Sequence, residues 1–433
     1  MGIRISTNTL FDQGIGTISD RQRSLLDAQQ KVSTGRRVVT PADDPIAAGR
    51  ILDLSQAKAA TTQFIENAGS ASASLAVSEQ SLQGVIRSLQ DVRSTIISAG
   101  NATLGDSGRA ILARELRGNY QELLSLANAT DGQGNYLFAG YRGQTQPFSE
   151  SAPGTVQYAG DQGQRMLQIS ASRYVPISDA GSEIFQRIRT GNGDFAAAAA
   201  VGNTGTGTIG IGALTDPAAW NANANPANFT IRFDVNGATN PATTTYDLVD
   251  NVSGNSLLTG AAASATGPYL RTFTPGSAIN LRSQGAEPAF DFGATVTVAG
   301  NPGDADTFTV SQSPTQSVFA TVNNLITALS TTISTPAQSA KLTNDLGAAL
   351  ANIDQAINRS LDVQTAIGSR MKEIDATEAT NIDLGLQFEE SASNLRDVDY
   401  AKAISDLTLQ RTLLEAAQKS FVQVQGLSLF NLL

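Results

Sequence analysis

Two stretches near the ends of the chain decide its fold, namely FDQGIGTISDRQRSLLDAQQKV (Phe11–Val32) and YAKAISDLTLQRTLLEAAQKSFVQV (Tyr400–Val424). In both, apolar side chains recur at steps of three and four residues, which places them on one face of an α-helix. Each helix must bury that face against another helix, and the nearest candidate for each end is the other end. The two stretches therefore predict a chain that folds back on itself as a long hairpin, the shape of a filament subunit.

The apolar faces of these two helices form a candidate assembly interface. A lone pair of helices buries one stripe and exposes the rest, and short helices are marginal in water. Pairing the two ends also closes a loop of nearly the whole chain, which adds an entropic cost. We therefore expect neighbouring subunits to complete the interface, and the ends to be mobile in the free monomer. The residues assigned to it are Phe11, Ile15, Ile18, Leu25, Val32, Tyr400, Ile404, Leu407, Leu414, Phe421, Val424 and Leu427.

A much longer helix is predicted between Ala47 and Ile96, because the same rhythm runs there in a single register. Asp44 precedes it as an N-cap, and Pro45 occupies the first helical position, where a missing amide donor does no harm. Several core positions are polar or small, which favours a multi-helix bundle over a two-stranded coiled coil.

Further helices follow the same pattern on both sides of the chain centre. One carries leucines from 112 to 126 and stops at the glycines of 131–135. Helix resumes near Ser317, breaks near Pro336 and runs from about Ala337 to Ala392. The terminal helix begins after Asp399.

Short strands are predicted at 136–139, 156–158 and 166–169, with Gly160–Gly163 as a hairpin turn between the last two. Residues 191–310 differ from the helical parts of the chain, because they have a low-complexity start followed by strand-like alternation. Their Gly- and Ala-rich start is expected to be flexible, and residues 229–235 alternate before a turn at 236–237 that indicates a hairpin. Val296 and Val298 are expected to pair with Phe308 and Val310 across a Gly/Pro/Asp turn.

The predicted fold is therefore mainly α with an inserted β-rich domain, arranged as a long-helix hairpin or bundle. Its terminal coiled-coil domain comprises residues 1–42 plus 394–433. A core helical bundle with short β-hairpins comprises residues 43–190 plus 312–393, and the outer β-rich insert spans 191–311.

Composition excludes several classes of function. Of the 433 residues, 16% are charged, well below the usual quarter, and the net charge of −10 argues against a nucleic-acid partner. The chain has no cysteine and no histidine, which removes disulfides, thiolate chemistry and imidazole ligands. The N-terminus has no hydrophobic signal core, and the longest apolar run, Phe195–Val201, is too short to cross a bilayer. We expect no membrane insertion and no cofactor.

Four charged or glycine-rich motifs are candidate sites. Asp43 and Asp44 suit a helix cap better than a metal site. The acidic groups at 389–390 and at 397 and 399 suit solvated faces and a helix start better than catalysis, because adjacent helical residues do not face each other. Residues 202–212 lack the GK[ST] of a phosphate loop. The basic cluster of Lys31, Arg36 and Arg37 is open between a solvated helix end and an intersubunit contact with acidic partners. No catalytic, metal or cofactor site is predicted.

Several local strings together resemble the flagellin superfamily. They are IRISTNTL (Ile3–Leu10), KVSTGRRVVTPADDPIAA (Lys31–Ala48), NYLFAGYRGQTQPF (Asn135–Phe148), YAGDQGQR (Tyr158–Arg165) and DVDYAKAISDLTLQRTLLEAAQKSFVQVQGLSLFNLL (Asp397–Leu433). The proline after the paired aspartates is more similar to hook-associated members than to flagellin itself. The resemblance covers about residues 1–190 and 315–433. Val298–Val310 is similar to a turn and strand of hook-associated proteins, and the rest of 191–297 resembles nothing we can name.

The resemblance implies a structural subunit of the bacterial flagellum that joins hook to filament. It would assemble with itself as a ring between another hook-associated protein and flagellin. It would also be extracellular, exported through the flagellar apparatus without a cleavable signal peptide, with a chaperone on its C-terminal helix. The alternatives are a flagellin-like filament subunit and, less favoured, a secreted adhesin with a helical stalk. An enzyme, with its site in the insert, is the most distant alternative.

Overall fold

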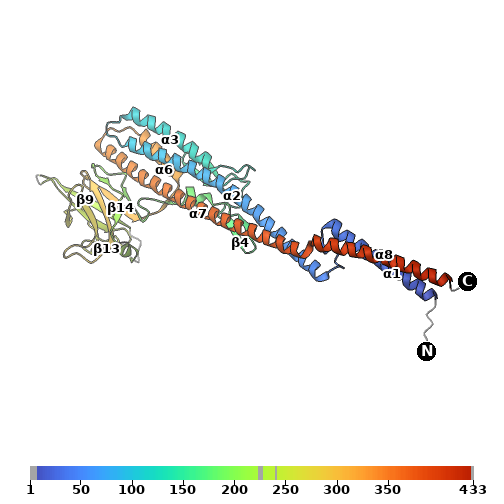
Figure 1. Ribbon diagram of the computed structural model, residues 1–433. Helices are drawn as coiled ribbons and strands as arrows, with labels where there is room; N and C mark the ends of the chain where they lie inside the picture. Colours follow the sequence, from blue (N-terminus) through green and yellow to red (C-terminus); the bar gives the residue numbers. More distant parts are fainter. Residues whose placement is uncertain (1–6, 223–227, 239–240, 431–433) are drawn as a thin grey trace. The chain divides into compact units, whose positions relative to one another are not determined.

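The computed structural model describes residues 7–222, 228–238 and 241–430, and confirms a mainly helical chain with an inserted β-rich region (Figure 1). The chain forms two compact units. The first unit contains the residues up to Gly69, Gln168–Arg173 and the residues from Asp375 on. The second unit contains Ser70–Leu167 and Tyr174–Ile374. None of the described helices is long and apolar enough to cross a membrane.

The first unit is built around helices α1 (Thr7–Thr34) and α8 (Tyr400–Phe430). The ring of Phe11 lies against that of Phe421, and Gly35 lies beside Tyr400, so the two helices are antiparallel. The prediction that the chain ends pair with each other is therefore confirmed. The unit also holds the beginning of α2 (Pro45–Ala99) and the end of α7 (Pro336–Arg396).

The second unit contains the remainder of α2 and α7, together with α3 (Asp106–Ala127) and α6 (Val318–Ser330). The single register predicted for α2 is confirmed, since Leu75, Leu82 and Leu89 are each at most 2% exposed. At about 1.5 Å per residue, its 55 residues span roughly 80 Å. Helix α7 continues four residues beyond the predicted end at Ala392, through Ser393–Arg396.

Short strands and one short helix join α3 to the insert, and some of them contribute to a small aromatic core. Phe148, Phe185 and Phe319 meet there, with ring centroids 5.3 and 5.7 Å from Phe148. Predicted strands at 156–158 and 166–169 exist, whereas 136–139 forms only isolated bridges. The elements are β1 (Phe148–Ala152), β2 (Thr155–Tyr158), β3 (Met166–Ser170), β4 (Arg173–Pro176) and α4 (Gly181–Phe185).

The hairpin predicted at Gly160–Gly163 is wrong. Strand β2 pairs with β1, and β3 pairs with β4. The Asp161 carboxylate accepts hydrogen bonds from the amides of Tyr141 (2.9 Å) and Gly163 (2.8 Å). Because this side chain holds the segment against the loop at Tyr141, its glycines serve a cross-loop contact and not a β-turn.

The insert is a sandwich of two sheets on a two-stranded neck formed by β5 (Ile188–Arg189) and β15 (Thr315–Gln316). One sheet has the order β11-β10-β9-β14-β6, and the other has the order β12-β13-β7, with β8 also paired to β13. The predicted hairpin is confirmed as β9 and β10. The elements are β6 (Phe195–Ala199), β7 (Thr208–Ile209), β8 (Ala213–Leu214), α5 (Pro217–Ala222), β9 (Asn228–Asn236), β10 (Thr243–Asp250), β11 (Arg271–Thr272), β12 (Ala278–Arg282), β13 (Asp291–Ala299) and β14 (Thr307–Gln312).

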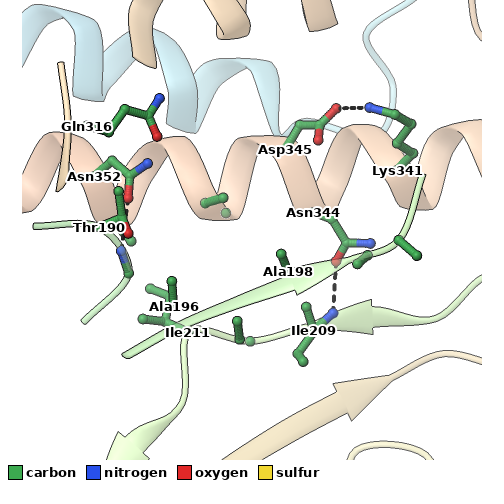
Figure 2. Close-up of a pocket in the computed structure, with 18 of the residues that line it drawn as sticks. Thr190, Ala196, Ala198, Ile209, Ile211, Gln316, Lys341, Asn344, Asp345 and Asn352 are labelled. Carbon is green, nitrogen blue, oxygen red and sulfur yellow. Dashed lines mark hydrogen bonds and ion pairs between the residues drawn. The ribbon is translucent and has the colours of Figure 1, made fainter. Parts of the chain in front are cut away.

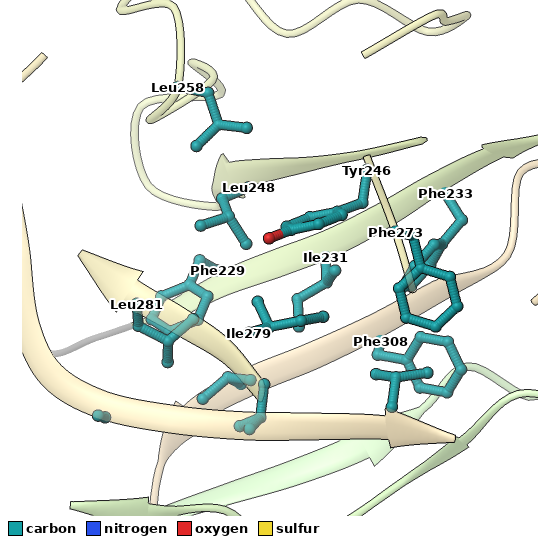
Figure 3. Packing of buried hydrophobic residues seen from close by; sticks show 14 of the residues in the cluster. Phe229, Ile231, Phe233, Tyr246, Leu248, Leu258, Phe273, Ile279, Leu281 and Phe308 are labelled. Carbon is teal, nitrogen blue, oxygen red and sulfur yellow. The ribbon is translucent and has the colours of Figure 1, made fainter. Parts of the chain in front are cut away.

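Two expectations about the insert are wrong. Val296 and Val298 lie on β13, whereas Phe308 and Val310 lie on β14 in the other sheet. These side chains meet across the sandwich core instead of along a ladder, as Figure 3 shows for Phe308 among its aromatic neighbours. The alanine-rich start is also ordered, because Phe195–Ala199 pairs with β14.

Candidate assembly surface on the terminal helices

The contact between α1 and α8 includes a close approach at one glycine and a pair of aromatic rings. The rings of Phe11 and Phe421 have centroids 5.5 Å apart. A Cβ atom at Gly14 would lie only 2.5 Å from the Phe421 ring, well inside van der Waals distance. The absence of a side chain at Gly14 therefore lets the Phe421 ring rest on the α1 backbone.

This pairing buries only part of the predicted interface. Its residues fall into three groups by exposure. Half-buried are Ile18, Leu25, Val32, Leu407, Leu414 and Phe421. Exposed are Phe11 (42%), Ile15 (48%), Tyr400 (55%), Ile404 (52%) and Val424 (50%), while the side chain of Leu427 lies outside the described residues.

Three further apolar residues on these helices are exposed, and helical periodicity did not predict them. Leu26, Leu409 and Val422 are 53–65% exposed. They lie one or two residues away from Leu25, Leu407 and Phe421, so a strict three-and-four stripe leaves them out. Their apolar character beside the stripe could have identified them, because an apolar face wider than one stripe needs more than one partner helix.

The exposed apolar surface is large in energetic terms. Fully burying a side chain of this size contributes about 1.5–3 kcal/mol, so covering the exposed half of one contributes on the order of 1 kcal/mol. The five exposed residues of the predicted interface and the three missed ones together provide several such increments. Exposed apolar side chains that gather on one pair of helices are typical of a surface that binds another protein. The terminal helices are therefore suited to bind further helices.

The paired aspartates before α2 serve the turn and the helix start, as predicted. Asp44 Oδ1 accepts a hydrogen bond from the Ala47 amide (3.0 Å), which caps α2. That bond, with the neighbouring Arg37 guanidinium, holds the pKa of Asp44 below its usual value. Asp43 Oδ2 accepts from the amides of Val39 and Thr40, and these bonds lower its pKa too.

The acidic residues near the end of α7 are engaged in ion pairs and in a second cap. Glu389 pairs with Lys58 of α2, which lowers the pKa of Glu389. The Glu389 side chain is still 42% exposed, so it lies on a solvated face, as expected, and carries an ion pair there. Asp399 Oδ1 accepts from the amides of Ala401 (3.0 Å) and Lys402 (3.2 Å), so its predicted place at a helix start is confirmed. The described ranges hold no group of three or more acidic residues placed to bind a metal ion.

The glycine-rich stretch 202–212 directs its amides at a carboxylate of the protein itself. Asp306 is 2% exposed and accepts hydrogen bonds from the amides of Thr204 (2.7 Å), Gly205 (3.0 Å) and Gly303 (2.7 Å). These donors already have an anionic partner, so they offer nothing to a phosphate group.

The basic cluster before α2 is largely paired within the chain. Lys31 pairs with Asp27 (2.8 Å) and Arg37 with Asp44 (3.2 Å). Arg36 forms a backbone bridge to Asp397. Two of the three cations are therefore neutralised by neighbours in the same chain.

A groove of about 240 Å³ lies between β6 and α7 in the second unit (Figure 2). Asn344 Oδ1 accepts from the Ile209 amide (2.8 Å), and Asn352 Oδ1 accepts from the Gly191 amide (2.9 Å). The Lys341 ammonium is paired with Asp345 (2.6 Å). The two asparagine side chains thus bond α7 to the insert, and the alanines and the ion pair that also line the groove form no catalytic constellation.

Comparison with known proteins points to one family. The bacterial flagellin N-terminal helical region matches residues 5–143, and the C-terminal helical region matches residues 350–433. Flagellar hook-associated protein 3 of Escherichia coli is 26% identical over 99% of both chains, so the similarity includes residues 191–297. A solved FlgL of Xanthomonas campestris is 30% identical, with a TM-score of 0.63 over 77% of this chain and 98% of that one. The flagellar junction protein FlgL of Legionella pneumophila is 28% identical, with a TM-score of 0.67 over 81% and 100%.

Proposed function

The chain belongs to the flagellar hook-associated protein 3 family, and we propose that it is a structural subunit of the bacterial flagellum that joins the hook to the filament. The observation that carries this proposal is the exposed apolar surface of α1 and α8. A pair of helices that leaves Ile15, Ile404 and Val424 about half exposed is suited to further helix–helix contacts. Full-length similarity to hook-associated relatives favours the junction as the place of those contacts.

In the proposed assembly, the chain forms a ring with copies of itself. The twelve interface residues of α1 and α8 would contact the neighbouring copies. One side of the ring would meet another hook-associated protein, and the other side would meet flagellin. Such a part acts as a mechanical adaptor and carries out no reaction. We keep the division into a terminal domain (1–42, 394–433), a core (43–190, 312–393) and an outward-facing insert (191–311) as part of this proposal.

Export completes the proposal. The subunit would leave the cell through the flagellar apparatus without a cleavable signal peptide and function outside the cell. Before export, a chaperone would cover the apolar face of α8, where Leu409 and Val422 are 53% and 65% exposed. Covering this face before assembly would prevent premature association between copies.

A flagellin-like filament subunit is the alternative, because the flagellin helical regions match both ends of the chain. Labelling the protein on intact flagella separates the two functions. A junction protein gives a single spot between hook and filament, whereas a filament subunit labels the whole filament. Incubation of the purified protein provides a second test, since a filament subunit grows long filaments alone. Label along the filament, or filaments grown from the pure protein, would refute the junction.

A further inference from the structure

Two linkers of the first unit, one between α1 and α2 and one between α7 and α8, are joined to each other by backbone hydrogen bonds. The linker after α1 and the linker after α7 form an antiparallel bridge between Arg36 and Asp397. The Arg37 amide donates to the Arg396 carbonyl (2.7 Å), and the Val398 amide donates to the Gly35 carbonyl (2.9 Å). The chain therefore pairs its two linkers as a short two-stranded ladder.

Side chains reinforce this ladder from the α1–α2 side. Arg37 Nη2 donates to the Leu395 carbonyl (2.7 Å), 358 residues away in sequence, and Nη1 donates to Asp44 Oδ2 (3.2 Å). Asp44 is also the cap of α2, through the Ala47 amide. One guanidinium thus connects the first turn of α2 with the last turn of α7, where a cation is favoured by the unpaired carbonyls.

The α7–α8 side adds a matching set of ion pairs. Arg396 Nε contacts Asp397 Oδ1 (2.9 Å), and Arg396 Nη2 lies 3.5 Å from Glu389 Oε1. Glu389 in turn pairs with Lys58 of α2. We call residues 35–38 and 395–398, with the side chains of Asp44, Lys58 and Glu389, the linker clamp.

A glycine brings the end of α1 against the start of α8. Gly35 has φ +70°, a left-handed conformation that ends a helix and disfavours other residues. A Cβ atom there would lie 2.7 Å from the Tyr400 hydroxyl. Tyr400 is the first residue of α8, so the clamp fixes the starting point of the antiparallel pair.

We propose that the linker clamp couples the two helix breaks into a single joint, so that α1 and α8 gain and lose order together, from the clamp outward. The terminal helices expose much apolar surface in the free subunit, and short helices are marginal in water. Holding their clamped ends together removes most of the loop-closure entropy that pairing them would otherwise cost. The alternative is two independent flexible linkers, in which each helix loses order by itself. This inference concerns the free subunit and does not depend on the proposed place in the flagellum.

Hydrogen exchange on the full-length monomer tests the coupling. Arg37→Ala removes the bonds to Leu395 and Asp44, and we expect about tenfold faster amide exchange in both α1 and α8, the size expected for one lost charge-assisted hydrogen bond. Arg411→Ala is the matched control, because Arg411 pairs with Glu415 one turn away in α8 at 3.2 Å and its side chain is 77% exposed. We expect little change in that variant. Faster exchange confined to residues 35–39 and 395–398, or to one helix alone, would overturn the proposal.

An engineered disulfide across the linker clamp provides a second test, because it should slow hydrogen exchange where Arg37→Ala speeds it. Arg36 and Asp397 are direct partners in an antiparallel bridge, a geometry with Cα atoms about 4.5–5.5 Å apart, which a disulfide can span. The chain has no cysteine of its own, so the double variant Arg36→Cys/Asp397→Cys forms a unique bond. Oxidation should slow exchange in α1 and α8 together, and reduction should reverse it. Unchanged exchange after verified oxidation would refute the coupling.

Discussion

The substitution Gly14→Ala tests how closely α1 and α8 approach each other. A Cβ atom at position 14 would lie 2.5 Å from the Phe421 ring, so helix and ring must separate by about 1 Å to reach ordinary contact distance. Alanine favours a helix interior by about 1 kcal/mol over glycine, whereas overpacking costs about 1–3 kcal/mol. The expected balance is a loss of about 0–2 kcal/mol in the stability of the helix pair.

Gly16→Ala is the matched control, because no atom lies within 4 Å of a Cβ at that position. The same helix then gains about 1 kcal/mol with no clash. The two variants therefore differ by about 1–3 kcal/mol, and hydrogen exchange of α1 and α8 should be about fivefold or more faster in Gly14→Ala than in Gly16→Ala, since about 1.4 kcal/mol corresponds to a factor of ten. Equal stabilisation by both substitutions would show that Phe421 does not rest on Gly14, and the described contact would be wrong.

The further predictions concern the insert, the exposed stripe and, for comparison with it, the buried face of α2. In the insert, Glu287→Gln leaves the buried Arg271 guanidinium without its counter-charge, and should destabilise the insert by about 3 kcal/mol. The single tryptophan, Trp220, packs on the insert core and reports its unfolding by fluorescence in urea; an unchanged midpoint would contradict the role of the pair. The hydrogen bond from Arg271 lowers the pKa of Glu287, so the pair's contribution is complete above the unfolded value near 4.3 and is lost as the pH falls through the folded pKa. The same fluorescence assay, run from pH 6 to pH 3, should therefore show a smaller acid loss in Glu287→Gln than in the natural chain. On α8, Ile404→Ala should change monomer stability by less than about 0.5 kcal/mol yet reduce incorporation into flagella, whereas the fully buried Leu82→Ala should cost about 2–5 kcal/mol in thermal unfolding.

The long helices could be predicted from sequence because their information is local. Apolar residues in α2 keep one register for fifty residues, and caps such as Asp44 act on amides only three residues away. The hairpin of β9 and β10 was equally accessible, since its alternation and its turn lie next to each other in the chain.

The pairing of strands within the insert could not be predicted in the same way. Val298 and Phe308 are close in sequence and both alternate with polar residues, yet they belong to different sheets of the sandwich. Alternation indicates that a side chain faces a core, but it does not indicate which strand lies alongside. The hairpin turn predicted at Gly160–Gly163 failed for a related reason, because the Asp161 side chain accepts a hydrogen bond from the amide of Tyr141, in another loop.

The candidate assembly surface on α1 and α8 could likewise be predicted only in part. That both ends are helices with an apolar stripe can be predicted from the residues alone, because helical periodicity follows from the covalent backbone. Which of those residues stay exposed is known only from the folded chain, since it depends on how far the antiparallel partner reaches across each face. The folded chain also shows that Arg37, predicted as part of a surface cluster, donates to the carbonyl of Leu395, 358 residues away in sequence. Hydrogen bonds between segments so far apart depend on the folded path of the chain, which no local pattern encodes.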